Sequence, residues 1–122
     1  MNLQEIIDEL KLDVLTKPQD FSAVIPQGGY SSDLLSCVMA GASREGIWVT
    51  LQAHGNVVAV AALLDLAAVI ITENARPDET SILRANTEGI TLLATPLPTY
   101  TVVGRLWELG LRAGNPAGGT GI

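Results

Sequence analysis

The residues best suited to ligand chemistry are concentrated in one short stretch, Gly28–Val38. It opens with two adjacent glycines, which allow the backbone to adopt positive φ angles and to approach a ligand closely. Ser31 or Ser32 can then act as the N-cap of a helix, with the Asp33 carboxylate favoured in its first turn by the helix dipole. The pattern therefore predicts a glycine turn leading into a capped helix. An anion on the turn's backbone N–H groups and a purely structural helix start are both compatible with it.

Further small or amide-bearing polar residues follow each of the later apolar runs in the sequence. If those runs are parallel strands, their carboxyl ends meet at one edge of a sheet, which is where such sheets bind ligands. We therefore expect the glycine turn and these residues to share one rim. The predicted ligand-binding residues are Gly28, Gly29, Tyr30, Ser31, Ser32, Asp33, Gln52, His54, Asn56, Thr72, Asn74 and Thr95.

His54 is the only histidine of the chain. The sequence offers it no second His and no cysteine pair to complete a metal site, so no metal is expected. As a general base it would need an acidic partner, for which Asp33 is the candidate. A hydrogen-bonding role in a loop, either structural or toward a ligand, is the preferred interpretation. We accordingly predict no catalytic residue and no cofactor.

Hydrophobic periodicity predicts a single α/β domain over residues 1–112, with a mainly parallel sheet of four to five strands and helices on both faces. The expected strands are 12–15, 21–25, 46–51, 67–72 and 90–94, and the expected helices are 3–10, 32–40, 57–64, 78–88 and 99–109. Asn56, Asp78 and Thr99 are the expected caps of the last three helices. Cys37 is expected on a buried stripe with Leu34 and Val38, and Trp48 in the core. The Gly-rich segment 113–122 is predicted to be a flexible tail.

Charge and composition exclude several classes of function. The net charge of −6 opposes binding to nucleic acid or to an anionic membrane, although backbone N–H groups can still hold a single nucleotide. The start of the chain has no signal-peptide pattern, and no apolar run is long enough to span a bilayer. A lone cysteine is typical of a reducing compartment, so we expect a cytoplasmic protein. Common kinase, dehydrogenase, protease and esterase motifs are missing from the sequence.

Four ordered blocks of the sequence resemble a known family, the DRTGG domains. The blocks are residues 28–36, 48–61, 70–72 and 90–95, followed by a helix that contains Gly104. The chain is similar to the small stand-alone form of this domain, which is hydrogenase-associated and resembles the N-terminal domain of HPr kinase. Two family pieces are changed, since Tyr30-Ser31 stands near the expected Asp-Arg and Thr72-Glu73-Asn74 stands where Thr-Gly-Gly would fall.

The resemblance implies an HPr-kinase-N-terminal-like fold and a non-catalytic, ligand-sensing regulatory module linked to energy or hydrogenase metabolism. It further implies an adenine nucleotide or another small anion as ligand, a homodimer, and a metabolic enzyme as partner. One alternative is an interaction subunit without a small-molecule ligand. The other is a small enzyme that uses Asp33 and His54.

Overall fold

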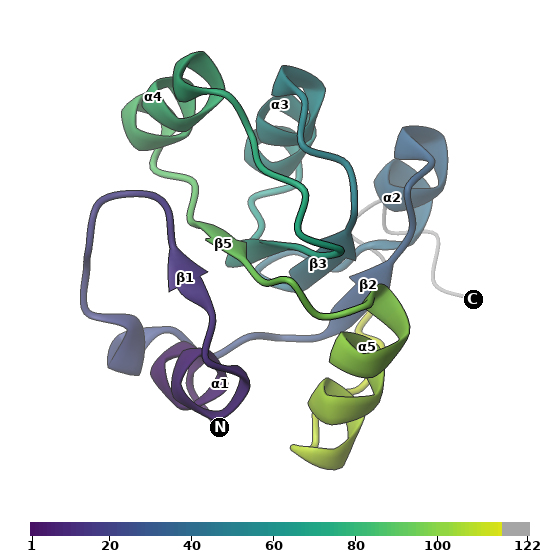
Figure 1. Ribbon diagram of the computed structural model, residues 1–122. Helices are drawn as coiled ribbons and strands as arrows, with labels where there is room; N and C mark the ends of the chain where they lie inside the picture. Colours follow the sequence, from purple (N-terminus) through teal and green to yellow (C-terminus); the bar gives the residue numbers. More distant parts are fainter. Residues whose placement is uncertain (116–122) are drawn as a thin grey trace.

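A five-stranded sheet forms the centre of the computed structural model, which describes residues 1–115 (Figure 1). The strands are β1 (Asp13–Val14), β2 (Gly29–Ser31), β3 (Ile47–Thr50), β4 (Ala68–Ile71) and β5 (Leu92–Ala94). The helices are α1 (Leu3–Leu10), the 3₁₀ helix η1 (Phe21–Ala23), α2 (Leu35–Gly41), α3 (Gly55–Leu63), α4 (Glu79–Glu88) and α5 (Thr99–Glu108). The sheet order is β1-β5-β4-β3-β2, with β1 antiparallel to β5 and the other pairs parallel. The predicted fold class is confirmed.

The order of the parallel strands decides where the helices lie. Strands β2 to β5 are neighbours in the same order in which they occur in the sequence. Because crossovers between parallel strands share one hand, consecutive crossovers in one direction place their helices on the same face. Figure 1 shows α2, α3 and α4 together on one face, while α1 and α5 cover the other.

Side-chain alternation along the strands divides the core into two layers. On the first face, Trp48, Val69 and Leu92 are buried beneath α2, α3 and α4. On the second face, Val49 and Ile70 are buried beneath α1 and α5. Strands covered on both faces are buried at every position, so β3 and β4 are apolar except at Thr50 and stand out in the sequence. Trp48 is fully buried, as predicted.

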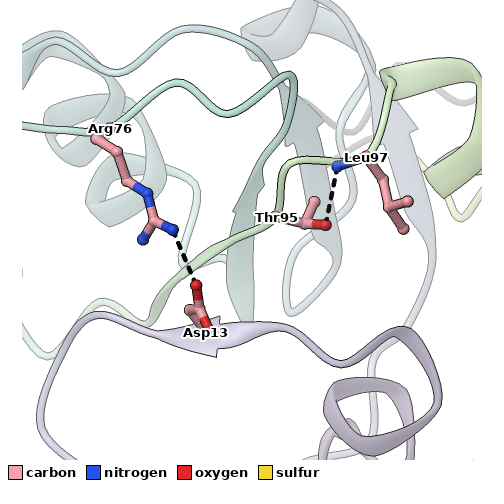
Figure 2. Close-up of polar contacts among 4 residues, drawn as sticks. All are labelled: Asp13, Arg76, Thr95 and Leu97. Atoms are coloured by element: carbon pink, nitrogen blue, oxygen red, sulfur yellow. Dashed lines mark hydrogen bonds and ion pairs between the residues drawn. The ribbon is translucent and has the colours of Figure 1, made fainter.

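The two edges of the sheet differ in chemistry. At the β1 edge, Asp13 forms an ion pair of 2.9 Å with Arg76, from the loop after β4 (Figure 2). Both side chains are about half exposed, so the pair contributes only about 0–1 kcal/mol to stability. The opposite edge is β2, where Gly29, Tyr30 and Ser31 carry no charge. A charged edge strand resists pairing with other chains, and β2 lacks this protection.

Three helix ends are fixed by local capping residues. The Asp78 side chain accepts a hydrogen bond of 2.8 Å from the Ser81 backbone N–H and caps α4. Gly89 ends this helix in the left-handed conformation, with φ of 72°. Asn2 and Glu5 form a capping box at the start of α1.

The segment from Phe21 to Ser32 was predicted wrongly. The expected strand 21–25 is instead the 3₁₀ helix η1, because the Asp20 carboxylate accepts from the Ser22 backbone N–H at 3.1 Å and turns the chain. The expected glycine turn is the start of strand β2, whose Tyr30 pairs in register with Trp48. Ser31 is therefore a strand residue, and neither serine caps α2 through a side chain.

Three smaller predictions are also corrected. Helix α3 starts at Gly55, so Asn56 lies inside it and His54 occupies the N-cap position. Thr99 is the first residue of α5 rather than its cap. Cys37 is exposed, because α2 begins at Leu35 and turns only Val38 fully inward.

The predicted tail begins just beyond the last helix. Its first residues are part of the described structure, and the Gly114 backbone lies against Gly28 and Ser43. The prediction for residues 116–122 lies outside the described residues.

Candidate functional site

The carboxyl edge of the parallel strands collects most of the predicted ligand-binding residues. Because β2, β3, β4 and β5 run parallel, the loops that follow them emerge at this edge. The residues that the structure places here are Ser32, Asp33, Gln52, His54, Asn56, Thr72, Asn74 and Thr95.

Asp33 joins two of these loops. Its carboxylate accepts hydrogen bonds from the Thr50 hydroxyl at 2.7 Å and from the Leu51 backbone N–H at 2.9 Å. The Gln52 side-chain amide donates back to the Asp33 carbonyl at 2.8 Å. The Asp33 carboxylate is thus engaged with β3 and its loop.

A second network joins the loop after β4 to the start of α5. The hydroxyls of Thr72 and Thr99 lie 2.5 Å apart. The Glu73 carboxylate accepts from the Thr99 backbone N–H at 2.8 Å, which caps α5 from outside the helix. The Asn74 backbone N–H donates to the Thr95 carbonyl at 3.1 Å. The sequence analysis missed the capping role of Glu73. Its one signal was that Pro98, at the N-cap position of α5, has no side chain that can cap the helix.

Glu73 and Asn74 both adopt left-handed backbone conformations, with φ of 59° and 61°. Few residues without the freedom of glycine do so, and Asn is among the most tolerant. The same short loop positions Thr95, whose hydroxyl accepts from the Leu97 backbone N–H at 3.1 Å (Figure 2). The hydroxyls of Thr72 and Thr95 therefore hold the loop structure together.

The N-terminus of α3 lacks a side-chain cap, as does that of the shorter helix α2. Helices α1 and α4 are capped by their own side chains, and Glu73 caps α5. At α3, His54 occupies the N-cap position without a side-chain hydrogen bond to the helix. His54 and Asn56 are both exposed. Uncapped N–H groups at the positive end of a helix dipole favour an anion.

The glycine pair lies at the opposite edge of the sheet, which corrects the prediction of a common rim. The Gly28 carbonyl accepts from the Ile47 backbone N–H at 2.8 Å, where β3 begins. The Gly29 backbone N–H is already bonded to the Arg112 carbonyl at 2.9 Å. A Cβ added at Gly28 would lie 2.4 Å from the Gly114 backbone nitrogen. These glycines allow close packing of the backbone, and Gly29 has no free N–H group for an anion.

Tyr30 and Ser31 lie on opposite faces of β2. The Tyr30 ring packs against Gly41 of α2, where an added Cβ would lie 2.4 Å from the ring. Ser31 is exposed and lines a cavity between β2 and α5. The Tyr30 ring is thus engaged in packing against α2, and Ser31 lies on the face covered by α5.

Metal binding finds no support among residues 1–115, where no group of three or more His, Cys, Asp or Glu side chains could hold an ion. The Asp33 carboxylate is engaged with Thr50 and Leu51. Over the same residues, no helix combines the length and the hydropathy needed to cross a bilayer.

The fold and the edge just described define a small α/β domain with a mainly parallel sheet, in which β2 to β5 are sequential neighbours. Comparison with known proteins gave no matching family model and no matching curated protein. Among solved structures, the chain is similar to the CBS and DRTGG domains of the regulatory region of Clostridium perfringens pyrophosphatase, complexed with the activator diadenosine tetraphosphate. The TM-score is 0.72 at 20% sequence identity.

The matched region covers 91% of this chain and 47% of the pyrophosphatase chain, so the chain spans about half the length of that structure. The likeness confirms the resemblance read from the sequence at the level of the fold, which is DRTGG-like.

Proposed function

We propose that this chain is a non-catalytic regulatory domain that senses a small anionic ligand, with an adenine nucleotide as the leading candidate. The fold supports this, since a similar structure belongs to a regulatory region solved with a nucleotide activator. The single observation that carries the proposal within this chain is the uncapped N-terminus of α3 at the carboxyl edge of the sheet.

The proposed anion site uses backbone groups rather than basic side chains. The amides at the start of α3 receive a phosphate, and the exposed side chains of His54 and Asn56 lie beside them as hydrogen-bond donors. A chain with a net charge of −6 can bind a phosphate in this way, because the helix dipole supplies the local positive potential.

A catalytic role for Asp33 and His54 has less support. General acid–base catalysis needs the two groups within hydrogen-bonding reach of each other or of a common proton. The Asp33 carboxylate is bonded to Thr50 and Leu51, and the described residues give no hydrogen bond between it and His54. The proposed domain therefore regulates and does not catalyse.

A protein-interaction role is the second candidate, and exposed leucines on the α2–α4 face favour it. Leu63 of α3 and Leu83 of α4 are 67% and 60% exposed, and the two helices pack against each other. Apolar side chains exposed on a surface are available for contact with another protein. This part of the proposal includes a homodimer or a docked metabolic enzyme as the partner. It also includes the link to hydrogenase metabolism and the cytoplasmic location.

Thermal unfolding with added nucleotides tests the primary proposal. ATP, ADP, AMP and diadenosine tetraphosphate are each titrated, with inorganic phosphate as a separate arm. A ligand present at about 100 times its Kd stabilises a protein by about 2.7 kcal/mol, which raises the midpoint by several degrees. We expect a concentration-dependent rise with at least one adenine nucleotide. A flat response to all of them contradicts the sensor and favours the interaction subunit.

Asn56→Asp tests the location of the anion. A carboxylate in the first turn of α3 interacts favourably with the helix dipole, which adds about 0.3–1 kcal/mol to the free energy of unfolding. The same negative charge repels a bound phosphate, so stability rises while nucleotide affinity falls. Gln27→Glu adds the same charge at the amino edge and serves as the matched control. Equal nucleotide affinities in the two variants would contradict a site at α3.

A further inference from the structure

The cavity that Ser31 lines lies between the edge strand β2 and helix α5, away from the N-terminus of α3. Its volume is about 200 Å³. The walls are mainly apolar and come from the sheet, from α5 and from the segment after it. The main lining residues are Gly29, Ser31, Val49, Val103, Leu106 and Trp107.

The cavity exists because β2 presents almost no side chain on this face. Tyr30 points toward α2, so Gly29 and Ser31 occupy the face that α5 shares. One of them has no side chain and the other has a short one. A Cβ at Gly29 would already lie 3.1 Å from the Leu111 side chain, which marks the end of the cavity.

An aromatic side chain and a cation stand at its rim. Trp107 is 57% exposed although it lines the cavity. The Arg112 guanidinium lies 3.8 Å from the centroid of the Trp107 ring and donates a hydrogen bond of 2.6 Å to the Trp107 carbonyl. These contacts hold a positive charge beside an open apolar cavity. Among residues 1–115, no acidic side chain lines the cavity.

The backbone of β2 adds polar groups along one wall. The Ile47 N–H donates to the Gly28 carbonyl, and the Ser32 N–H donates to the Val49 carbonyl. The even-numbered residues along β2 and its two flanking positions therefore bond to β3. In a parallel ladder the alternate residue then directs its N–H and C=O to the other side. The backbone groups of Ser31 therefore face the open edge.

We propose that this cavity binds a small aromatic carboxylate. Binding pockets for drug-sized ligands measure about 300–1,000 Å³, so about 200 Å³ admits a single ring system. The apolar walls and Trp107 take the ring, and Arg112 pairs with the carboxylate. The apolar lining disfavours a polar nucleobase, whose hydrogen-bonding groups would be desolvated there without partners. This site is independent of the anion site at α3.

Phenylacetate is the probe, and the two tryptophan indole resonances in a ¹H–¹⁵N spectrum are the readout. Trp48 is fully buried and its indole N–H is bonded to the Ser32 carbonyl, whereas Trp107 lines the cavity. We expect the Trp107 resonance to shift with saturation and the Trp48 resonance to stay in place. Benzyl alcohol lacks the charge and acetate lacks the ring. Each should bind at least about tenfold more weakly than phenylacetate.

Variants assign the binding to the cavity. Val103→Phe and Ser31→Leu fill it from opposite walls, and both start from exposed side chains that the fold does not bury. Either variant should abolish the shift. Arg112→Gln should weaken binding about tenfold, as expected for the loss of a charge-assisted hydrogen bond. Arg44→Gln removes an exposed positive charge that does not line the cavity and should leave affinity unchanged.

Three outcomes would overturn the proposal: no Trp107 shift at millimolar phenylacetate, a shift that survives both filling variants, or equal affinities for phenylacetate and benzyl alcohol. A shift with AMP that both filling variants abolish, without one from phenylacetate, would instead assign the cavity to the nucleotide. The nucleotide experiment tests Asn56, which does not line this cavity. Either proposed site can therefore be contradicted without affecting the other.

Discussion

Asp33 illustrates how one carboxylate can serve structure at a place where sequence suggests chemistry. Its oxygen accepts from Thr50 and Leu51, and its carbonyl accepts from the Gln52 amide. Three hydrogen bonds thus hold two loops of the carboxyl edge together. His54 of the second loop remains exposed. At this scale, the site consists of fixed loops beside an uncapped helix end.

Asp78 is the residue for which a pH dependence follows. Hydrogen bonds from Ser81 lower the pKa of the Asp78 carboxyl. The larger effect comes from the Ser81 backbone N–H and the smaller from the Ser81 side chain. The folded pKa is therefore below the ordinary value of about 3.9 in the unfolded chain. Its contribution to stability is complete above that ordinary value and is lost as the pH falls through the lower, folded pKa.

Asp78→Asn tests this contribution, because asparagine is an equally good N-cap that does not titrate. We expect the variant to match the parent near neutral pH and to lose less stability in acid. Urea unfolding between about pH 2 and 6 measures the difference. Parallel pH profiles for parent and variant would show that Asp78 makes no such contribution.

At the scale of elements, α5 contains a glycine that its position does not require. Gly104 lies inside the helix, and a Cβ there would meet nothing within 4 Å. Gly104→Ala should raise the free energy of unfolding by about 0.5–1 kcal/mol, because glycine loses more backbone freedom on folding. Chemical unfolding measures this.

Gly89→Ala is the matched control for that substitution. A Cβ at Gly89 also has open space, but its φ of 72° is unfavourable for alanine. We expect this variant to lose stability. Equal effects of the two substitutions would mean that backbone conformation does not decide the outcome.

How much of the fold the sequence predicts depends on how each element is stabilised. Strands β3 and β4 are buried on both faces, so their apolar residues reveal them. Asp78 and Gly89 mark α4 through local capping. The strand β2 has no such local signal and forms because Tyr30 pairs with Trp48 across the sheet.

That one missed strand explains most of the error in the candidate site. With β2 read as a turn before a helix, Gly28 and Gly29 were expected at the carboxyl edge, and the structure has them at the amino edge. The residues that follow β3 and β4 were placed correctly, because those strands were recognised. The cavity beside Trp107 depends on long-range packing between β2 and α5, which no local pattern encodes.

At the scale of the whole molecule, α1 completes one side of the core. The crossovers place α2, α3 and α4 on the opposite face, so α1 and α5 are the α-helices of the described chain that cover this one. Arg105 of α5 donates a hydrogen bond of 2.8 Å to the Glu9 carbonyl and links the two helices. The buried residues of α1 are Leu3, Ile6, Ile7 and Leu10.

Removing residues 1–10 should prevent folding. Burial of each large apolar side chain contributes about 1.5–3 kcal/mol, and four of them together contribute roughly 6–12 kcal/mol. Domains of this kind are stable by only about 5–15 kcal/mol. Circular dichroism should show loss of cooperative unfolding in the truncated chain. The exposed-face variant Glu9→Gln should fold normally, and a truncated chain that still unfolds cooperatively would contradict this role of α1.

The hydrogen bond from Thr99 to Glu73 ties the loop after β4 to the first turn of α5. The same helix, about two turns further on, supplies Trp107 to the cavity beside β2. The Glu73 contact and the cavity residue Trp107 therefore lie toward opposite ends of one helix. A movement of α5 that pivots on this anchored first turn would change the width of the cavity without breaking the Glu73 contact.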